Sequence, residues 1–256
     1  EEGGFSSSRA EVLLKSSHRQ EALLEQIKEI LKEKGYGGVD VDFEYLQPGL
    51  AGAYTAFIER LRQELNKLGY TVQVALAPKV SRGQKGLLYE SHDYAALGRA
   101  ANGALLMTYE WGYNAGPPMA VAPLDKVRQV VDYALGEIEA KKLFLGVPVY
   151  GYDWPLPYRQ GATRGVSVAP QEALDLARRQ GAEIQFDETA QAPWFRYTAA
   201  DGREHEVWFE DARSSYAKFR LAAEKGLQGV GLWNLMRPAV QTYLVLHGGF
   251  EIEIMR

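Results

Sequence analysis

The sequence predicts an α/β fold in which helices cover a mainly parallel sheet. Short apolar segments alternate along the chain with longer segments whose apolar residues recur at helical spacing, and two of the clearest helical segments end at a glycine. The apolar segments are nearly continuous, which is typical of strands buried on both faces of a parallel sheet. With 256 residues, 46% of them hydrophobic, the chain can form one large domain or two small ones.

Five parallel strands are expected, at residues 38–44, 71–77, 103–110, 143–150 and 228–234. Helices are expected between and around them, at residues 18–34, 51–68, 93–101, 124–142, 212–225 and 238–246. A closed (β/α)8 barrel needs eight strands. The strand count therefore leaves two alternatives: an open doubly wound sheet, or a chain that begins part-way through a barrel.

Residues 161–211 break the alternation. Here "PQEALDLARRQG" has a helical pattern, whereas "AEIQFDE", "PWFRYT" and "HEVWFE" resemble short strands. A turn containing Asp201 and Gly202 joins the last two strands. We expect a small α+β insertion before the last strand of the parallel sheet.

Composition excludes several classes of function. Lys and Arg number 29 against 33 for Asp and Glu, so the basic excess typical of nucleic-acid-binding proteins is absent. The chain has no cysteine, which excludes disulfides, thiol catalysis and thiolate metal sites. Its four histidines are scattered without metal-ligand spacing, and no apolar run approaches the length of a membrane span. No metal, cofactor, nucleic acid or membrane span is expected.

The segment "GGVDVDFEY", residues 37–45, points most clearly to chemistry. It places Asp40, Asp42 and Glu44 at every second position among apolar residues, so in a strand all three carboxylates share one face. Like charges side by side raise one another's pKa values, which is costly unless chemistry uses it, so the spacing fits a functional site and a solvated edge strand equally well. A hard cation on these three acids is an alternative.

The same segment resembles the D-G-x-D-x-D-x-E signature of glycoside hydrolase family 18, the chitinase-like TIM barrels. Gly38, Asp40, Asp42 and Glu44 match it, and Gly37 replaces the first aspartate. In that family the signature lies on the fourth barrel strand, with the glutamate at its carboxyl end.

Three further segments resemble the family in order and spacing. "LLMTYEWGY" matches an M-x-Y-D strand through Met107 and Tyr109, with Glu110 in place of the aspartate. "GVPVYGYDW" matches a V-P-x-Y-G-R strand through Tyr150, with Tyr152 where arginine often stands, and "GLWNL" supplies the final-strand Trp233. "MTYEWGYNAGPPMAVAPL" and "GGFSS" resemble the spore cortex-lytic and spore-germination branch, peptidoglycan N-acetylglucosaminidases often fused to LysM domains.

The resemblance implies a (β/α)8 TIM barrel that lacks its first three strands. Residues 1–256 would form a partial family 18 catalytic barrel, with residues 161–211 inserted in it. The S-x-G-G-bearing third strand and any signal peptide would precede Glu1.

The resemblance also implies a mechanism in which the sugar's own 2-acetamido group acts as nucleophile. Glu44 would be the acid and then the base, Asp42 would stabilise the oxazolinium, and Tyr109 would hold the acetamide oxygen. Asp40, expected deeper in the barrel, would share a proton with Asp42. Sugar contacts are expected from Trp233, Met107, Tyr150, Glu110, Trp111 and Trp154.

The expected activity is retaining hydrolysis of β-1,4 bonds at N-acetylglucosamine in peptidoglycan, either spore cortex or its fragments. A chitinase acting on chitooligosaccharides is one alternative, and a catalytically silent lectin-like relative is another. Glu44 argues against the lectin, whereas an incomplete barrel argues for it. The expected location is extracellular, at the cell wall or in the spore coat or cortex.

Overall fold

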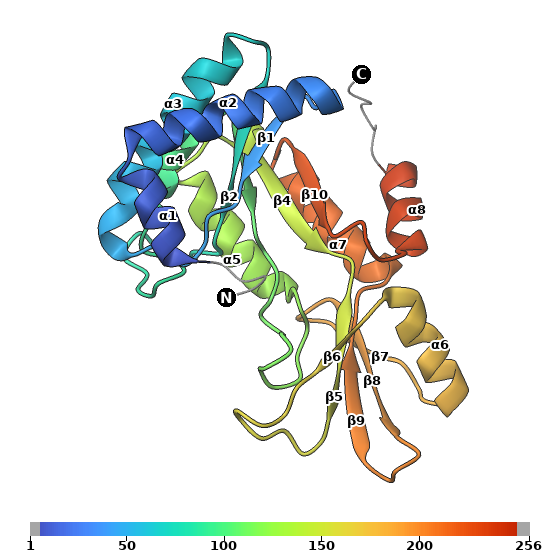
Figure 1. Cartoon of the computed structure of the whole chain (residues 1–256). Coiled ribbons are helices and arrows are strands. Elements are labelled where there is room, and N and C mark those ends of the chain that lie inside the picture. Colours follow the sequence, from blue (N-terminus) through green and yellow to red (C-terminus); the bar gives the residue numbers. More distant parts are fainter. Residues whose placement is uncertain (1–5, 250–256) are drawn as a thin grey trace.

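The computed structural model describes residues 6–249 of the chain and contains two units (Figure 1). The larger one is built on a curled five-stranded sheet in the order β1-β2-β3-β4-β10, in which every pairing is parallel. The strands are β1 (Gly38–Val41), β2 (Thr71–Leu76), β3 (Gly103–Leu106), β4 (Leu143–Pro148) and β10 (Gly229–Trp233). The predicted parallel sheet is therefore confirmed, and its curl is that of part of a barrel.

Helices precede, separate and follow the strands along the chain, and several of them pack on the sheet (Figure 1). They are α1 (Ser7–Leu14), α2 (Ser17–Lys34), α3 (Ala51–Asn66), α4 (Tyr94–Ala100), α5 (Leu124–Leu135), α7 (Ala212–Glu224) and α8 (Val240–Gly249), with short 3-10 turns η1 (Pro48–Leu50) and η2 (Ala140–Lys142). Helix α1 lies outside the predicted helices. It is capped by Ser6, just as α2 is capped by Ser16, and each serine side chain accepts a backbone N–H from the first turn.

Helix α3 shows how the sequence pattern becomes core. Its apolar residues recur three or four positions apart and are all buried: Tyr54, Phe57, Ile58, Leu61 and Leu65. This stripe packs on β2. Each of these side chains contributes about 1.5–3 kcal/mol through removal of apolar surface from water.

All five parallel strands end before their predicted last residue, and the difference is largest for β1 and β3. Strand β1 ends at Val41 instead of residue 44, and β3 ends at Leu106 instead of residue 110. Glu44 and Tyr109 therefore lie just beyond the carboxyl edge of the sheet. In barrel-type α/β folds this edge is where loops form the functional site.

The smaller unit is an antiparallel sheet in the order β6-β5-β9-β8-β7, with α6 on its flank (Figure 1). Its elements are β5 (Gly151–Pro155), β6 (Val166–Val168), α6 (Pro170–Gln180), β7 (Gln185–Asp187), β8 (Ala192–Thr198) and β9 (Glu204–Trp208). The predicted helix, the three strands and the turn at Gly202, whose φ is 81°, are all present. This sheet also contains β5, so it begins before residue 161, and the strand predicted at 143–150 ends at Pro148, just before β5 begins.

Strands β1 and β10 are the two outer strands of the parallel sheet. Closure of a barrel by three further strands stays a prediction. Residues 3–5 of the "GGFSS" stretch lie outside the described residues. Among the helices of residues 6–249, we find none with the length and apolar character needed to cross a bilayer.

Candidate active site

A pocket of about 400 Å³ opens beyond the carboxyl ends of β1, β2 and β3. Five of the residues predicted from the sequence lie on its wall: Glu44, Met107, Tyr109, Glu110 and Trp111. The other lining residues are Tyr45, Pro78, Leu88, Tyr89 and Tyr113. The pocket thus combines carboxylates with several aromatic rings, a composition suited to holding a sugar.

Glu44 is half-buried three residues past the end of β1. Burial, followed by the negative charges of Asp42 and Glu110, raises its pKa to about 7. A carboxyl with this pKa holds its proton near neutral pH and can donate it to a reacting group. The next residue, Tyr45, has a φ of 54°, a left-handed conformation that costs energy for a side chain of this size.

Asp40 and Asp42 extend the row of acids along β1. The prediction that Asp40 lies deep in the barrel is wrong for this structure, because β1 is an outer strand and both aspartates reach solvent. Neighbouring protein atoms still desolvate them in part. This raises the pKa of Asp40 to about 6, with the charge of Asp42 adding to the effect, and it raises the pKa of Asp42 as well. Asp42 and Glu44 together line an adjoining pocket of about 390 Å³.

Tyr109 stands among these acids. Burial raises its pKa above the ordinary value, and the charges of Asp42 and Glu44 add to this effect, so its hydroxyl stays a hydrogen-bond donor. Its ring packs on Gly146, where a Cβ would lie 2.9 Å from Cε1 of Tyr109. The ring also lies parallel to that of Trp233, with centroids 6.5 Å apart.

Glu110 is held by two tyrosines from the β4–β5 segment. The hydroxyl of Tyr150 donates to Oε1 of Glu110 at 2.5 Å, and the hydroxyl of Tyr152 donates to the same oxygen at 3.0 Å. Glu110 has a φ of 66°, so a second strained residue lies on the pocket wall. The position where the family often has arginine is thus occupied by Tyr152, which binds the carboxylate without neutralising it.

The remaining predicted contact residues have different surroundings. Trp233, at the end of β10, is 49% exposed and is joined to Asn234 by a cis peptide bond. Met107 is buried beneath the pocket, whereas Trp111 is half-buried and packs partly on the main core. Trp154 is wrongly predicted as a sugar contact, because it is 0% exposed and covered by Gly165.

Several residues of the site are not predicted by the sequence pattern. Tyr45, Tyr89 and Tyr113 line the pocket from loops, where no periodic pattern marks them. The sequence predicts no role for His92, because it lacks metal-ligand spacing. In the structure its Nε2 bonds to the backbone oxygen of Phe43, next to Glu44. Its position, immediately before a helix capped by Asp93, is the only local signal that the sequence gives.

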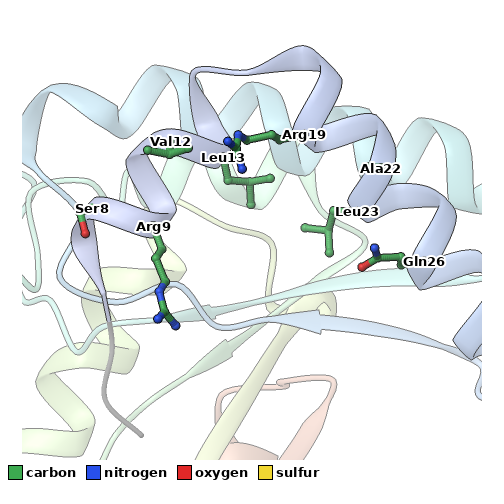
Figure 2. Close-up of a pocket in the computed structure, with 8 residues that line it drawn as sticks. All are labelled: Ser8, Arg9, Val12, Leu13, Arg19, Ala22, Leu23 and Gln26. Carbon is green, nitrogen blue, oxygen red and sulfur yellow. The ribbon is translucent and has the colours of Figure 1, made fainter. Parts of the chain in front are cut away.

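A second groove, of about 460 Å³, lies between α1 and α2 (Figure 2). It is lined by Ser8, Arg9, Val12, Leu13, Arg19, Ala22, Leu23 and Gln26. Among residues 6–249, none of the side chains that line this groove is a carboxyl that could act as an acid catalyst. Within residues 6–249, no three histidine or acidic side chains are grouped as a metal site would require.

Comparison with known proteins indicates the same family that the site residues resemble. The profile described as Glycosyl hydrolases family 18 matches residues 3–237. The chain belongs to glycosyl hydrolase family 18. The fold of this family is the (β/α)8 barrel, with which the curled sheet agrees.

Named relatives within family 18 place the chain near one branch. It is 45% identical over 252 residues to the cortical fragment-lytic enzyme of Bacillus subtilis (strain 168), an alignment that covers 98% of this chain and 58% of the relative. The crystal structure of the Bacillus megaterium QM B1551 spore cortex-lytic enzyme SleL superposes with a TM-score of 0.95 at 43% identity, covering 99% of this chain and 58% of that one. A Chromobacterium violaceum chitinase structure superposes with a TM-score of 0.88 at 28% identity, covering 96% and 76%.

The predicted resemblance to the spore cortex-lytic branch of family 18 is therefore confirmed. The chain spans a little over half the length of its curated Bacillus relatives.

Proposed function

We propose that this chain carries the catalytic centre of a retaining glycosidase that cleaves β-1,4 bonds at N-acetylglucosamine in peptidoglycan. The observation that carries the proposal is the half-buried Glu44, whose pKa is raised to about 7. It lies on a pocket wall with Tyr109 and next to Asp42. One proton-holding acid among other carboxylates is what substrate-assisted hydrolysis requires.

The first step breaks the glycosidic bond. Glu44 gives its proton to the leaving oxygen while the carbonyl oxygen of the 2-acetamido group attacks the anomeric carbon. The sugar becomes an oxazolinium ion, and the positive charge is balanced by the now ionised Glu44 and by Asp42. In the second step Glu44 takes a proton from water, and the resulting hydroxide attacks the anomeric carbon. The bond from this carbon to the acetamide oxygen breaks, which opens the five-membered oxazolinium ring and restores the acetamide. Two displacements leave the anomeric configuration unchanged.

The remaining groups orient the acetamide. The hydroxyl of Tyr109 donates to the acetamide oxygen, and the carboxylate of Asp42 accepts from the acetamide N–H. Asp40, with its pKa near 6, supplies a proton that the Asp40–Asp42 pair shares. Orientation of a nucleophile in this way can lower the barrier by several kcal/mol. The exposed face of Trp233 packs against the sugar ring.

Spore cortex fragments are the proposed substrate, because relatives that align with 98% of this chain are named cortical fragment-lytic enzymes. The site would then act in the spore cortex or cell wall, with LysM domains outside this chain as glycan anchors. A chitinase is the second candidate, favoured by the superposition on the Chromobacterium chitinase structure. A silent lectin is disfavoured because Glu44 is present with a raised pKa.

The test compares the intact protein with its Glu44→Gln variant on cortex fragments and on chitooligosaccharides. We expect the wild type to release reducing ends from cortex fragments faster than from chitooligosaccharides, with the β-anomer formed first in proton NMR spectra. Glu44→Gln should lose at least about 100-fold in rate, the usual contribution of a general acid. Equal release by both proteins would refute the assignment of Glu44.

A further inference from the structure

His92 lies where the ladder between β1 and β2 stops. Thr71 N–H donates to the Gly37 carbonyl at 3.0 Å, and the register of the two strands is then unbroken as far as Val41 and Val74. If this register continued, the N–H of Ala77, six residues after Thr71, would bond to the carbonyl of Phe43, six residues after Gly37. In the structure those two groups do not bond to each other.

The imidazole of His92 bridges them instead. Ala77 N–H donates to Nδ1 at 2.9 Å, and Nε2 lies 2.9 Å from the carbonyl oxygen of Phe43. Because Nδ1 accepts a hydrogen bond, the single proton of the neutral ring is on Nε2, which therefore donates to Phe43. Burial lowers the pKa of His92 to about 4, so the ring stays neutral.

The bridge is fixed from several sides. His92 is 1% exposed, and its carbonyl accepts a hydrogen bond from the buried ammonium of Lys79 at 3.0 Å. The ring of Tyr54 lies against the imidazole and also stacks on Phe43. The carbonyl that begins the Phe43–Glu44 peptide is therefore bound by a buried, closely packed imidazole.

We propose that His92 is a positioning residue that sets the location of the acid Glu44. The imidazole takes the place of one ladder hydrogen bond and holds β1 apart from β2 at the carboxyl edge, where Pro78 and Glu44 both line the pocket. The role in catalysis rests on the proposed function of Glu44. The bridge itself is a matter of geometry and can be tested without turnover.

The test uses three variants of His92 in the intact protein. Asn keeps an acceptor for Ala77 but is too short to reach Phe43, Gln can reach Phe43 with an amide N–H, and Ala removes both contacts. Ser91→Ala is the matched control, because Ser91 is equally buried and donates to the backbone of Gln47 in the neighbouring loop.

The kinetic readout is kcat on two glycosides that differ only in their leaving group. A sugar leaving group needs the proton of Glu44, whereas a nitrophenolate does not. We expect His92→Asn to lower kcat about 100-fold for the sugar leaving group. The loss should be much smaller for the nitrophenyl glycoside, with KM nearly unchanged, and His92→Gln should recover part of it. Equal losses on both substrates, or no loss, would overturn the positioning role.

The structural readout separates this proposal from the proposed function. Crystal structures of His92→Asn and His92→Ala should show the Phe43–Glu44 peptide displaced, with Ala77 N–H bonded directly to Phe43 in the alanine variant. An unmoved Glu44 would refute the bridge, whatever the kinetics. If Glu44→Gln keeps full activity while the peptide moves as expected, the proposed function fails and the positional role of His92 stands.

Discussion

The rings of Tyr109 and Trp233 lie almost parallel, at an interplanar angle of 13° with their centroids 6.5 Å apart. Tyr109 follows β3 and Trp233 ends β10, and β4 separates these two strands in the sheet. Their contact brings a hydroxyl that can orient an acetamide next to an exposed face that can pack on a sugar ring. In the proposed mechanism, one of these adjacent side chains positions the nucleophile and the other binds the sugar.

We predict that Tyr109→Phe and Trp233→Ala affect different kinetic parameters. Removal of the hydroxyl should lower kcat about 10- to 100-fold with little change in KM, because only the orientation of the acetamide is lost. Loss of the indole should raise KM roughly tenfold, corresponding to about 1.4 kcal/mol of binding. Steady-state kinetics on cortex fragments measure both, with Trp194→Ala in the smaller sheet as the control. The opposite pattern would contradict these roles.

The charge of Glu110 raises the pKa of Glu44, so its removal should change the pH profile. The wild type should lose kcat/KM as the pH rises through about 7, where the acid ionises. In Glu110→Gln this alkaline limb should move to lower pH, since one repulsive charge is gone. Glu137→Gln, which removes a carboxylate paired with Arg82 at the surface, is the control. An unmoved limb would exclude coupling between the two carboxyls.

Glu44→Gln should stabilise the fold at neutral pH. The pKa of Glu44 is raised from 4.5 to about 7, so the folded protein binds this proton more tightly than the unfolded chain. The stability that the protonated carboxyl provides is complete below pH 4.5 and is lost as the pH rises through about 7. Above that pH the variant should exceed the wild type by about 1–2 kcal/mol, a range reduced for partial exposure. Urea unfolding at acidic and alkaline pH measures the difference, and a constant difference would contradict the assigned pKa.

Gly146→Ala should disturb Tyr109 from below. An added Cβ would lie 2.3 Å from the carbonyl oxygen of Leu106 and 2.9 Å from the ring of Tyr109, so backbone and ring must both move. We expect a loss of about 1–3 kcal/mol in stability, the usual cost of overpacking, together with lower kcat. Gly52→Ala, where a Cβ meets nothing, is the matched control. Full activity of Gly146→Ala would show that the position of Tyr109 is not critical.

The parallel sheet was predictable because its apolar strands and amphipathic helices are strongly periodic. Sequence periodicity did not show where pairing stops, and both β1 and β3 end before the residues that carry the chemistry. The sequence also does not separate β5 from β4, because apolar residues continue past Pro148, where the chain leaves the parallel sheet for the antiparallel one.

The arrangement of the acids on and after β1 was predictable for a similar reason. A period of two places Asp40, Asp42 and Glu44 on one face, and the structure retains their electrostatic coupling. Contacts that depend on tertiary placement were not readable: the full burial of Trp154, the tyrosines around Glu110, and the bridge made by His92. These contacts join segments far apart in the sequence, and no periodic pattern within one segment indicates them.

The most direct test of the proposed catalytic centre is a crystal structure with a thiazoline analogue of N-acetylglucosamine, a stable mimic of the oxazolinium ion. We predict that its five-membered ring lies between Asp42 and Tyr109, with the carboxyl of Glu44 facing the anomeric carbon. Binding in the groove between α1 and α2 (Figure 2), or anywhere out of reach of Glu44, would contradict the proposal.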